Sequence, residues 1–174
     1  MHLSQLILNP YCRQVQREHR TPYQTHRTIM NAFPGCLLPD ERVLFRWEDE
    51  QRGARIRLLV QSVSEPDWSF LTDRPGDYLL GPVQSKPFNP VFSVGQVLAF
   101  RLRANPTVKR GGKRYGLLRE EEQLAWLVHK GVQGGFSLLT NEVRTQERGF
   151  VRDWTQREQP LSLLSVQFDG LLRV

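Results

Sequence analysis

The sequence opens with Leu3-Ser4-Gln5-Leu6-Ile7-Leu8-Asn9-Pro10, and this stretch decides how the first half of the chain folds. Its apolar residues predict a short strand over 3–8. Asn9 and Pro10 then offer an N-cap residue and a first-turn proline, which predict a brief helix through about Glu18. A strand that leads directly into a helix indicates an α+β layer pair, in which helices pack on a sheet.

Thr21-Pro22 repeats the capping residue and the proline, and predicts a second helix from Tyr23 to about Phe33. Apolar stretches at 43–47 and 55–63, on either side of a polar turn, predict a hairpin. Residues 64–90 hold five prolines, so we expect a long connection there with one helical turn at 67–71.

Residues 97–103 alternate between apolar residues and residues that include Arg101 and Arg103, which predicts a half-buried strand with its arginines facing outward. The order of elements up to this strand is ferredoxin-like in outline. A basic, Gly-containing linker follows, and then an amphipathic helix that ends at Gly134-Gly135. Three strands, around 136–139, 143–154 and 161–174, close the chain. We therefore expect a first domain over 1–104, a linker over 105–116 and a second domain over 117–174.

The composition of the 174 residues favours a globular protein, because 39% are hydrophobic and 10% are aromatic. No apolar run approaches the roughly 20 residues that cross a bilayer, so we expect no membrane partner. The N-terminus lacks the basic region and the cleavage site of a signal peptide. Cys12 and Cys36 have no metal-binding spacing. These features predict a cytoplasmic protein with reduced thiols.

The net charge is +6, and the cations are unevenly distributed. Residues 78–119 contain no acidic residue, and a block of one sign attracts a polyanion. Nucleic acid is the leading candidate, because phosphate contacts release counterions. A basic face that only confers solubility is the alternative. The block carries Lys86, Arg101, Arg103, Lys109, Arg110, Lys113, Arg114 and Arg119.

The chemistry that the sequence supports is cleavage of RNA without a metal or another cofactor. The chain offers no convincing cluster of acidic ligands, and RNA supplies its own nucleophile in the 2′-OH. Tyr23 and His26 lie three apart on the predicted second helix, hence on one face, and Arg27 borders them. Histidine suits proton transfer near neutral pH. The alternative is a packed amphipathic edge, which His26 would flank beside Ile29 and Phe33.

The same residues carry a resemblance to a known family. The chain resembles the CasE (Cse3) family, the precursor-RNA endoribonucleases of type I-E CRISPR systems. The motifs that carry this resemblance are L-x-x-L-x-L-N-P at 3–10 and P-Y-x-x-H-R-x-I at 22–29. Further similar segments, in the same order as in the family, are 65–68, 86–88, 100–106, 113–114, 123–127 and 134–136. Each motif is weak alone, but their order and spacing together are specific, and the resemblance covers nearly the whole chain.

The resemblance implies two tandem ferredoxin-like domains and metal-independent cutting at the 3′ side of a CRISPR repeat hairpin. It implies products with a 2′,3′-cyclic phosphate and a 5′-OH, and retention on the guide RNA beside the other subunits of the Cascade complex. It assigns the catalytic roles to His26 and Tyr23. The family's closing Gly-rich segment would begin beyond Val174, so we expect the second domain as given to be incomplete, without its last helix and strand.

Several basic residues are expected to hold the RNA. The strand and linker would follow its backbone, Arg27 would steady a phosphate, and the strand pair near 148–157 could enter a groove of the stem, whose geometry would be recognised mainly by shape. A non-catalytic subunit that caps a guide RNA remains the alternative function, since it needs the same cations but not His26. The full set is Arg13, Arg27, Arg101, Arg103, Lys109, Arg110, Lys113, Arg114, Arg148, Arg152 and Arg157.

Overall fold

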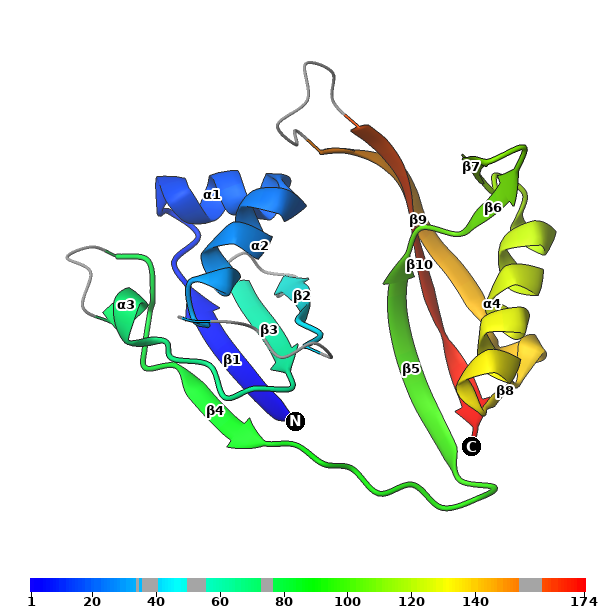
Figure 1. Cartoon of the computed structure of the whole chain (residues 1–174), viewed down its shortest axis with the longest axis horizontal. Helices are drawn as coiled ribbons and strands as arrows, with labels where there is room; N and C mark the ends of the chain where they lie inside the picture. The colour runs from blue at the N-terminus through cyan, green and yellow to red at the C-terminus, as the bar shows by residue number, and fades with distance from the viewer. Residues whose placement is uncertain (34, 36–40, 50–55, 73–76, 154–160) are drawn as a thin grey trace. The chain divides into compact units, whose positions relative to one another are not determined.

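A computed structural model describes the whole chain except residues 34, 36–40, 50–55, 73–76 and 154–160 (Figure 1). The chain divides into two compact units, Met1–Pro90 and Val91–Val174. Each unit combines helices with an antiparallel sheet, as the sequence predicts. Among the helices that the structure describes, none combines the length and the apolar character that a bilayer span requires.

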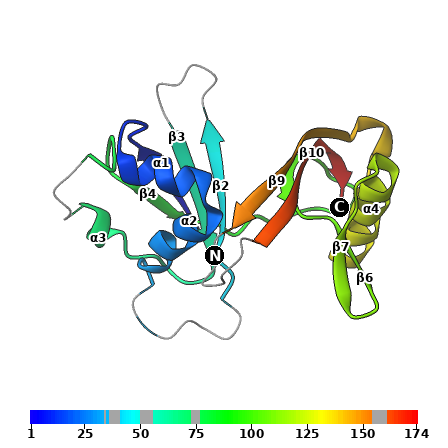
Figure 2. The same cartoon turned by 90° about the horizontal axis from the view of Figure 1, so that it is seen from above.

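The first unit is a four-stranded antiparallel sheet in the order β2-β3-β1-β4. Helices α1 and α2 lie against one face of this sheet (Figures 1 and 2). The elements are β1 (His2–Leu8), α1 (Arg13–Arg20), α2 (Pro22–Met30), β2 (Leu44–Asp49), β3 (Ile56–Ser62), α3 (Ser69–Thr72) and β4 (Gln84–Pro87).

Alternation along β1 explains why the helices pack where they do. Leu6 and Leu8 are buried, at 1% and 0% exposure, and their sequence neighbours are half-buried on the opposite face. Val15 of α1 and Ile29 of α2 join them in one core. Burying a side chain of this size contributes about 1.5–3 kcal/mol, so these few contacts hold α2 firmly against the sheet.

The second unit is built around the long strand β10, which pairs with β5 on one edge and with β9 and β8 on the other. Leu127 of α4 packs on Val166 and Phe168 of β10, and these residues form the core. Its elements are β5 (Val97–Ala104), β6 (Thr107–Arg110), β7 (Lys113–Gly116), α4 (Glu120–Gly134), β8 (Ser137–Leu138), the 3₁₀ turn η1 (Thr140–Glu142), β9 (Arg144–Asp153) and β10 (Leu161–Arg173).

The segment expected as a basic linker is instead a β-hairpin. Strands β6 and β7 pair from Thr107↔Gly116 to Arg110↔Lys113. Gly111 and Gly112 connect them with φ angles of 54° and 79°. Two central residues with positive φ make the tight turn that matches the twist of paired strands, and glycine adopts it without strain.

The strand at 97–103 also lies in a different place from the one expected. The sequence predicts this strand in the first domain, which would end at residue 104, but β5 pairs with β10 along its whole length, and the first unit ends at Pro90. The fourth strand of the first sheet is β4, which pairs with β1 inside the stretch expected to be only a connection. The predicted helical turn in that stretch is present as α3.

Helix boundaries differ from the expectation at α1. The helix begins at Arg13 with Cys12 as its N-cap residue, not at Asn9-Pro10. The Asn9 side chain instead accepts a hydrogen bond from the Tyr11 N–H at 3.0 Å, and the Asn9 N–H donates to the Tyr78 carbonyl. The polar groups of Asn9 that could cap a helix are thus hydrogen-bonded in the turn that precedes α1. Helix α2, expected from Tyr23 to about Phe33, begins one residue earlier, at Pro22, and ends at Met30.

Candidate functional site

Helix α2 presents Tyr23 and His26 at one edge of the first unit. Thr25 and Ile29 are buried beneath the helix, so the residues on its other sides are turned toward solvent. His26 is exposed and Tyr23 is half-buried. Their spacing of three places them on one face of the helix, as predicted. An exposed imidazole beside a phenol can exchange protons with a bound substrate.

A buried carboxylate fixes the position of α2 relative to α1. Glu18 is 3% exposed and accepts three hydrogen bonds. Gln14 Nε2 and Thr28 Oγ1 donate to its Oε1 at 2.7 and 2.6 Å, and the Tyr78 hydroxyl donates to its Oε2 at 2.6 Å. The Thr25 hydroxyl also donates to the backbone carbonyl of Glu18 at 2.7 Å. The helix that carries His26 is thus held by a closed polar network as well as by apolar packing.

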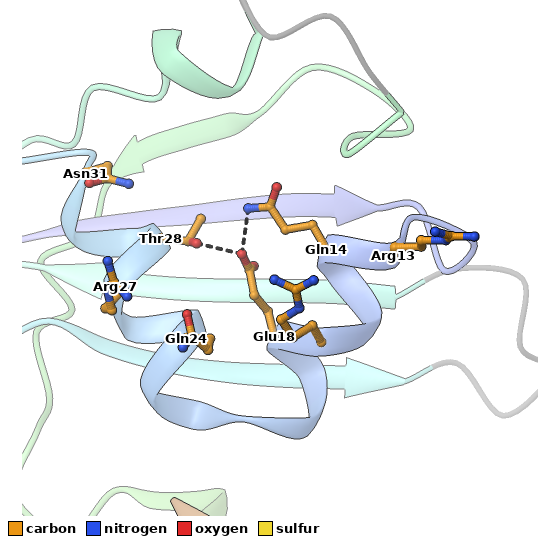
Figure 3. A pocket seen from close by; sticks show the side chains of 8 residues that line it. Arg13, Gln14, Glu18, Gln24, Arg27, Thr28 and Asn31 are labelled. Carbon is orange, nitrogen blue, oxygen red and sulfur yellow. Dashed lines mark hydrogen bonds between the residues drawn. The ribbon is translucent and has the colours of Figure 1, made fainter. Parts of the chain in front are cut away.

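A pocket of about 440 Å³ lies between α1 and α2 (Figure 3). Both helices contribute polar side chains to it, and three of these are arginines. The set is Arg13, Gln14, Arg17 and Glu18 from α1, with Gln24, Arg27, Thr28 and Asn31 from α2 and the residue that follows it. Arg27 therefore belongs to the pocket, whereas Tyr23 and His26 are not among the residues that line it. Arg27 borders both groups, because it is four residues from Tyr23 and three from Gln24 of the pocket.

The other described histidines have ordinary surroundings. His19 packs edge-on against Trp47, with ring centroids 4.9 Å apart. His2 lies in β1 opposite Ser62 and Pro87, and His129 is exposed on α4. Among the described residues, no three His, Cys, Asp or Glu side chains come close enough to hold a metal ion together. Of these four histidines, His26 is the one that shares a helix face with a tyrosine.

The two arginines of β5 have partners across the sheet. Arg101 Nε donates to Asp169 Oδ1 at 2.7 Å, and Arg103 Nη2 donates to Gln167 Oε1 at 3.4 Å. Both pairs join directly opposed positions on β5 and β10. The basic block contains no acidic residue in the sequence, but in the folded unit Arg101 forms an ion pair with Asp169. This ion pair reduces the charge that Arg101 can offer to a ligand.

The β6–β7 hairpin, in contrast, concentrates cations at an exposed tip. Lys109, Arg110, Lys113 and Arg114 are all exposed and flank the Gly111-Gly112 turn. No ion pair involving these four side chains occurs within the part of the chain that the structure describes. Like charges this close repel one another, and a polyanion relieves that repulsion. The hairpin is the strongest cationic feature that the structure places in one spot.

Comparison with known proteins identifies the family. A family described as CRISPR associated protein matches residues 1–174. The CRISPR-associated endoribonuclease Cse3 of Thermus thermophilus is 39% identical over 186 aligned positions, which span 100% of this chain and 86% of that protein. The chain belongs to the Cse3 (CasE) family of CRISPR-associated endoribonucleases.

Solved Cse3 structures have the same fold as this chain. One, a Cse3 bound to a 19-nucleotide RNA, matches with a TM-score of 0.87 at 35% identity and covers 100% of this chain and 86% of its own. Another, Thermus thermophilus Cse3 bound to an RNA that represents a pre-cleavage complex, matches with a TM-score of 0.86 at 35% identity and covers 99% and 84%.

The remaining predicted contacts of this Cse3 family member are Arg148, Arg152 and Arg157 in the second half of the chain and Arg13 in the first unit. Arg148 and Arg152 are in β9, opposite Val166 and Ser162 of β10, where the strands contain a register shift. Their side chains and the whole of Arg157 lie outside the described residues. Arg13 is the first residue of α1 and lines the pocket between the helices.

Sequence reasoning missed most of that pocket. The sequence marks Glu18 only as the approximate end of the first helix, and Arg17, Gln24 and Asn31 belong to no motif. A periodic signal was nevertheless present. Arg13 and Arg17 are four apart, and Gln24 and Asn31 are seven apart, so each pair shares one face of its helix. Two polar faces on adjacent helices can enclose a pocket only if the helices pack together, and that packing is not a local property of the sequence.

Proposed function

We propose that this Cse3 family member is an endoribonuclease of precursor CRISPR RNA in the cytoplasm. It binds the hairpin of a CRISPR repeat and cuts at its 3′ side without a metal ion. The single observation that carries this proposal is the exposed His26 beside Tyr23 on a helix fixed by the Glu18 network. The family membership, and the RNA-bound structures of similar Cse3 proteins, support the substrate class.

The reaction uses the substrate's own nucleophile. The 2′-oxygen attacks the adjacent phosphorus, the bond from phosphorus to the 5′-oxygen breaks, and a 2′,3′-cyclic phosphate and a 5′-OH remain. The 2′-OH must lose a proton and the 5′-oxygen must gain one. Tyr23 orients or polarises the 2′-OH, and His26 either protonates the leaving oxygen or activates the nucleophile. Arg27, which follows His26 directly, steadies the phosphate charge.

Binding rests on cations outside this helix. The four exposed cations of the β6–β7 hairpin follow the RNA backbone, and Arg148, Arg152 and Arg157 approach the stem. A-form grooves are recognised largely through shape, so the hairpin geometry and the bases near the cut determine specificity. We further propose that the protein stays on the processed guide RNA within the Cascade complex.

Both units are proposed to be ferredoxin-like. In the first, the order β-α-β-β-α-β, with α1 and α2 together in the first helical position, and the sheet order β2-β3-β1-β4 support this assignment. In the second, β5, α4, β9 and β10 correspond to the first four elements of the same motif. The remaining helix and strand of that motif have no counterpart among the described elements.

The test is cleavage of a repeat hairpin RNA in excess EDTA by the parent chain and by His26→Ala. We expect the variant to lose roughly 10²–10⁴-fold in rate, the usual contribution of proton transfer, and to keep its affinity for the hairpin. His129→Ala is the matched control, because it removes another exposed histidine. Equal cutting by His26→Ala and the parent would contradict the proposal.

Two modified substrates sharpen this test. An RNA with a 2′-deoxy residue directly upstream of the cut should bind and remain intact; its cleavage would make water the nucleophile. An RNA with sulfur in place of the leaving 5′-oxygen needs no acid, because a thiolate is a better leaving group. If His26 is the acid, this RNA restores most of the rate of His26→Ala; if His26 is the base, the defect remains. Hairpin binding by the parent without cutting would favour the alternative, a non-catalytic guide-RNA subunit.

A further inference from the structure

Four residues that line the pocket between α1 and α2, namely Arg13, Arg17, Gln24 and Asn31, have no role in the packing of the helices or in the proposed cleavage reaction. Arg13 and Arg17 line it from α1 and Arg27 from α2, and Figure 3 shows Arg13 and Arg27 toward opposite ends of the pocket. All three are exposed, and none forms an ion pair with a residue that the structure describes. Three arginines that line one pocket give it a positive potential, which points to an anion that binds there.

The fold itself gives no reason for the charge. Arg13 is the first residue of α1, where the helix dipole disfavours a cation, and the first turn of α1 contains no acidic residue. The acid nearest to these arginines in the pocket is Glu18. Both of its carboxylate oxygens already accept hydrogen bonds, from Gln14, Thr28 and Tyr78. Glu18 therefore serves the packing of the helices and leaves the arginines to a ligand.

The remaining lining residues suit a nucleobase. The amide groups of Gln24 and Asn31 border the pocket, and neither has a hydrogen-bond partner among the described residues. A primary amide both donates and accepts, and this combination matches the edges of bases. The volume of about 440 Å³ lies within the range of pockets that hold small ligands. One nucleotide fits such a pocket, but a paired stem does not, because its bases are stacked inside a convex helix.

We propose that this pocket holds one unpaired nucleotide of the RNA strand that flanks the repeat hairpin. Arg13 and Arg17 bind its phosphate, and Gln24 and Asn31 contact the edge of its base. This inference rests on the proposed function and extends it, because it gives the enzyme a contact with single-stranded RNA outside the hairpin. An acidic protein segment would satisfy the arginines but would leave the amides without a role.

The first test compares Arg13→Gln/Arg17→Gln with the parent on three RNAs. These are a trimmed hairpin, the same hairpin with a 5′ single-stranded flank, and the hairpin with a 3′ flank, each with a 2′-deoxy residue at the cut. We expect the variant to bind one flanked RNA roughly 10-fold or more weakly and the trimmed hairpin normally, because the proposal assigns the RNA contact of Arg13 to the flank and not to the hairpin. The salt slope for that flanked RNA should fall by about 0.7 per lost phosphate contact.

Arg20→Gln is the matched control, since Arg20 is an exposed arginine of the same helix that does not line the pocket. It should change none of the three affinities beyond a general charge effect. Arg17→Gln alone guards against a folding defect in the double variant, and it should show a smaller loss in the same direction. Unchanged affinity for both flanked RNAs, or an equal loss for all three RNAs, would overturn the proposal.

The second test examines the base. Abasic residues are placed one at a time along the flank, and one position should weaken binding to the parent. In the double variant Gln24→Ala/Asn31→Ala, removal of the base at that position should no longer weaken binding, whereas any effect of removing the base at another position should be the same as in the parent. An effect that persists at full size would rule out the amides as base contacts. Cutting of the trimmed hairpin by the parent tests the proposed function separately, so a failure of the pocket leaves that result intact.

Discussion

Replacing Glu18 by Ala should destabilise the first unit more than any exposed substitution in α1. The substitution removes the acceptor for Gln14, Thr28 and Tyr78 at once. Tyr78 is only 5% exposed, so its hydroxyl would lose its partner in a buried place. An orphaned buried donor costs about 1–3 kcal/mol, and hydrogen bonds to a charged group contribute about 1.5–3 kcal/mol each.

These terms do not add fully, because burying the carboxylate itself has a cost that the variant avoids. Gln14 and Thr28 are only half-buried and border the pocket, so water can replace their partner. We therefore expect a loss of about 3–4 kcal/mol for Glu18→Ala and about 1–2 kcal/mol for Tyr78→Phe, which removes one donor of the three. The hydrogen bonds to the Glu18 backbone carbonyl survive either change, so the variants should still fold.

Urea unfolding followed by circular dichroism measures the loss, and amide hydrogen exchange in α1 and α2 assigns it to the first unit. Glu121→Ala, which removes an exposed carboxylate of α4, is the control. The Glu18–Tyr78 double variant should show a coupling energy of about 0.5–3 kcal/mol. A loss below about 1 kcal/mol for Glu18→Ala, or no coupling, would refute the view that the network holds α2 in place.

Two further outcomes follow from the surface. Changing Lys109, Arg110, Lys113 and Arg114 to Gln should flatten the salt dependence of RNA affinity by about 0.7–0.9 per lost phosphate contact, and should weaken the affinity for cognate and non-cognate stems alike. Circular dichroism is the folding control. An unchanged salt dependence in the folded variant would exclude the β6–β7 hairpin from RNA binding. Burial raises the pKa of Glu41, but hydrogen bonds from the Ser64 hydroxyl and from the backbone N–H groups of Val63 and Ser64 together lower it by more. The net pKa of Glu41 therefore lies below its ordinary value. A carboxyl group whose pKa is lower in the folded state than its unfolded value of 4.5 stabilises the fold at pH values above 4.5, and this stabilisation is lost as the pH falls through the folded pKa. The difference in unfolding free energy between the parent and Glu41→Gln should therefore be present at about pH 7 and disappear toward about pH 3. A difference that does not change with pH would contradict this assignment.

The elements with strong local signals were predictable. Strand β1 and helix α2 form where apolar periodicity and a Thr-Pro start indicate them, and the β2–β3 hairpin pairs as expected. Strand β4 has no such signal, because all four of its residues are exposed and none forms an apolar alternation. It exists through its pairing with β1, including the contact between the Ser4 and Ser85 hydroxyls at 3.0 Å. Pairing between distant segments is not encoded in either strand alone.

The candidate site was predictable to the same degree. The spacing of Tyr23 and His26 needs only the helix to bring them onto one face, and α2 is present. The partners of Arg101 and Arg103 lie 68 and 64 residues further along the chain, so no inspection of the basic block could find them. Glu18 is buried by Tyr78, which is 60 residues away, and its role became visible only in the folded unit.

The residues that we propose for catalysis and those that we propose for binding have different structural requirements, and the fold places them differently. Proton transfer needs a side chain placed within a fraction of an ångström, and His26 stands on a helix secured by buried leucines and a closed carboxylate network. Attraction of phosphate acts over about 8–10 Å at ordinary salt and needs little positional accuracy. The β6–β7 hairpin accordingly carries exposed cations on a short ribbon with little apolar burial. Substitutions beneath α2 should therefore impair the rate of cutting, whereas substitutions in the hairpin should impair binding and leave the rate of the bound complex unchanged.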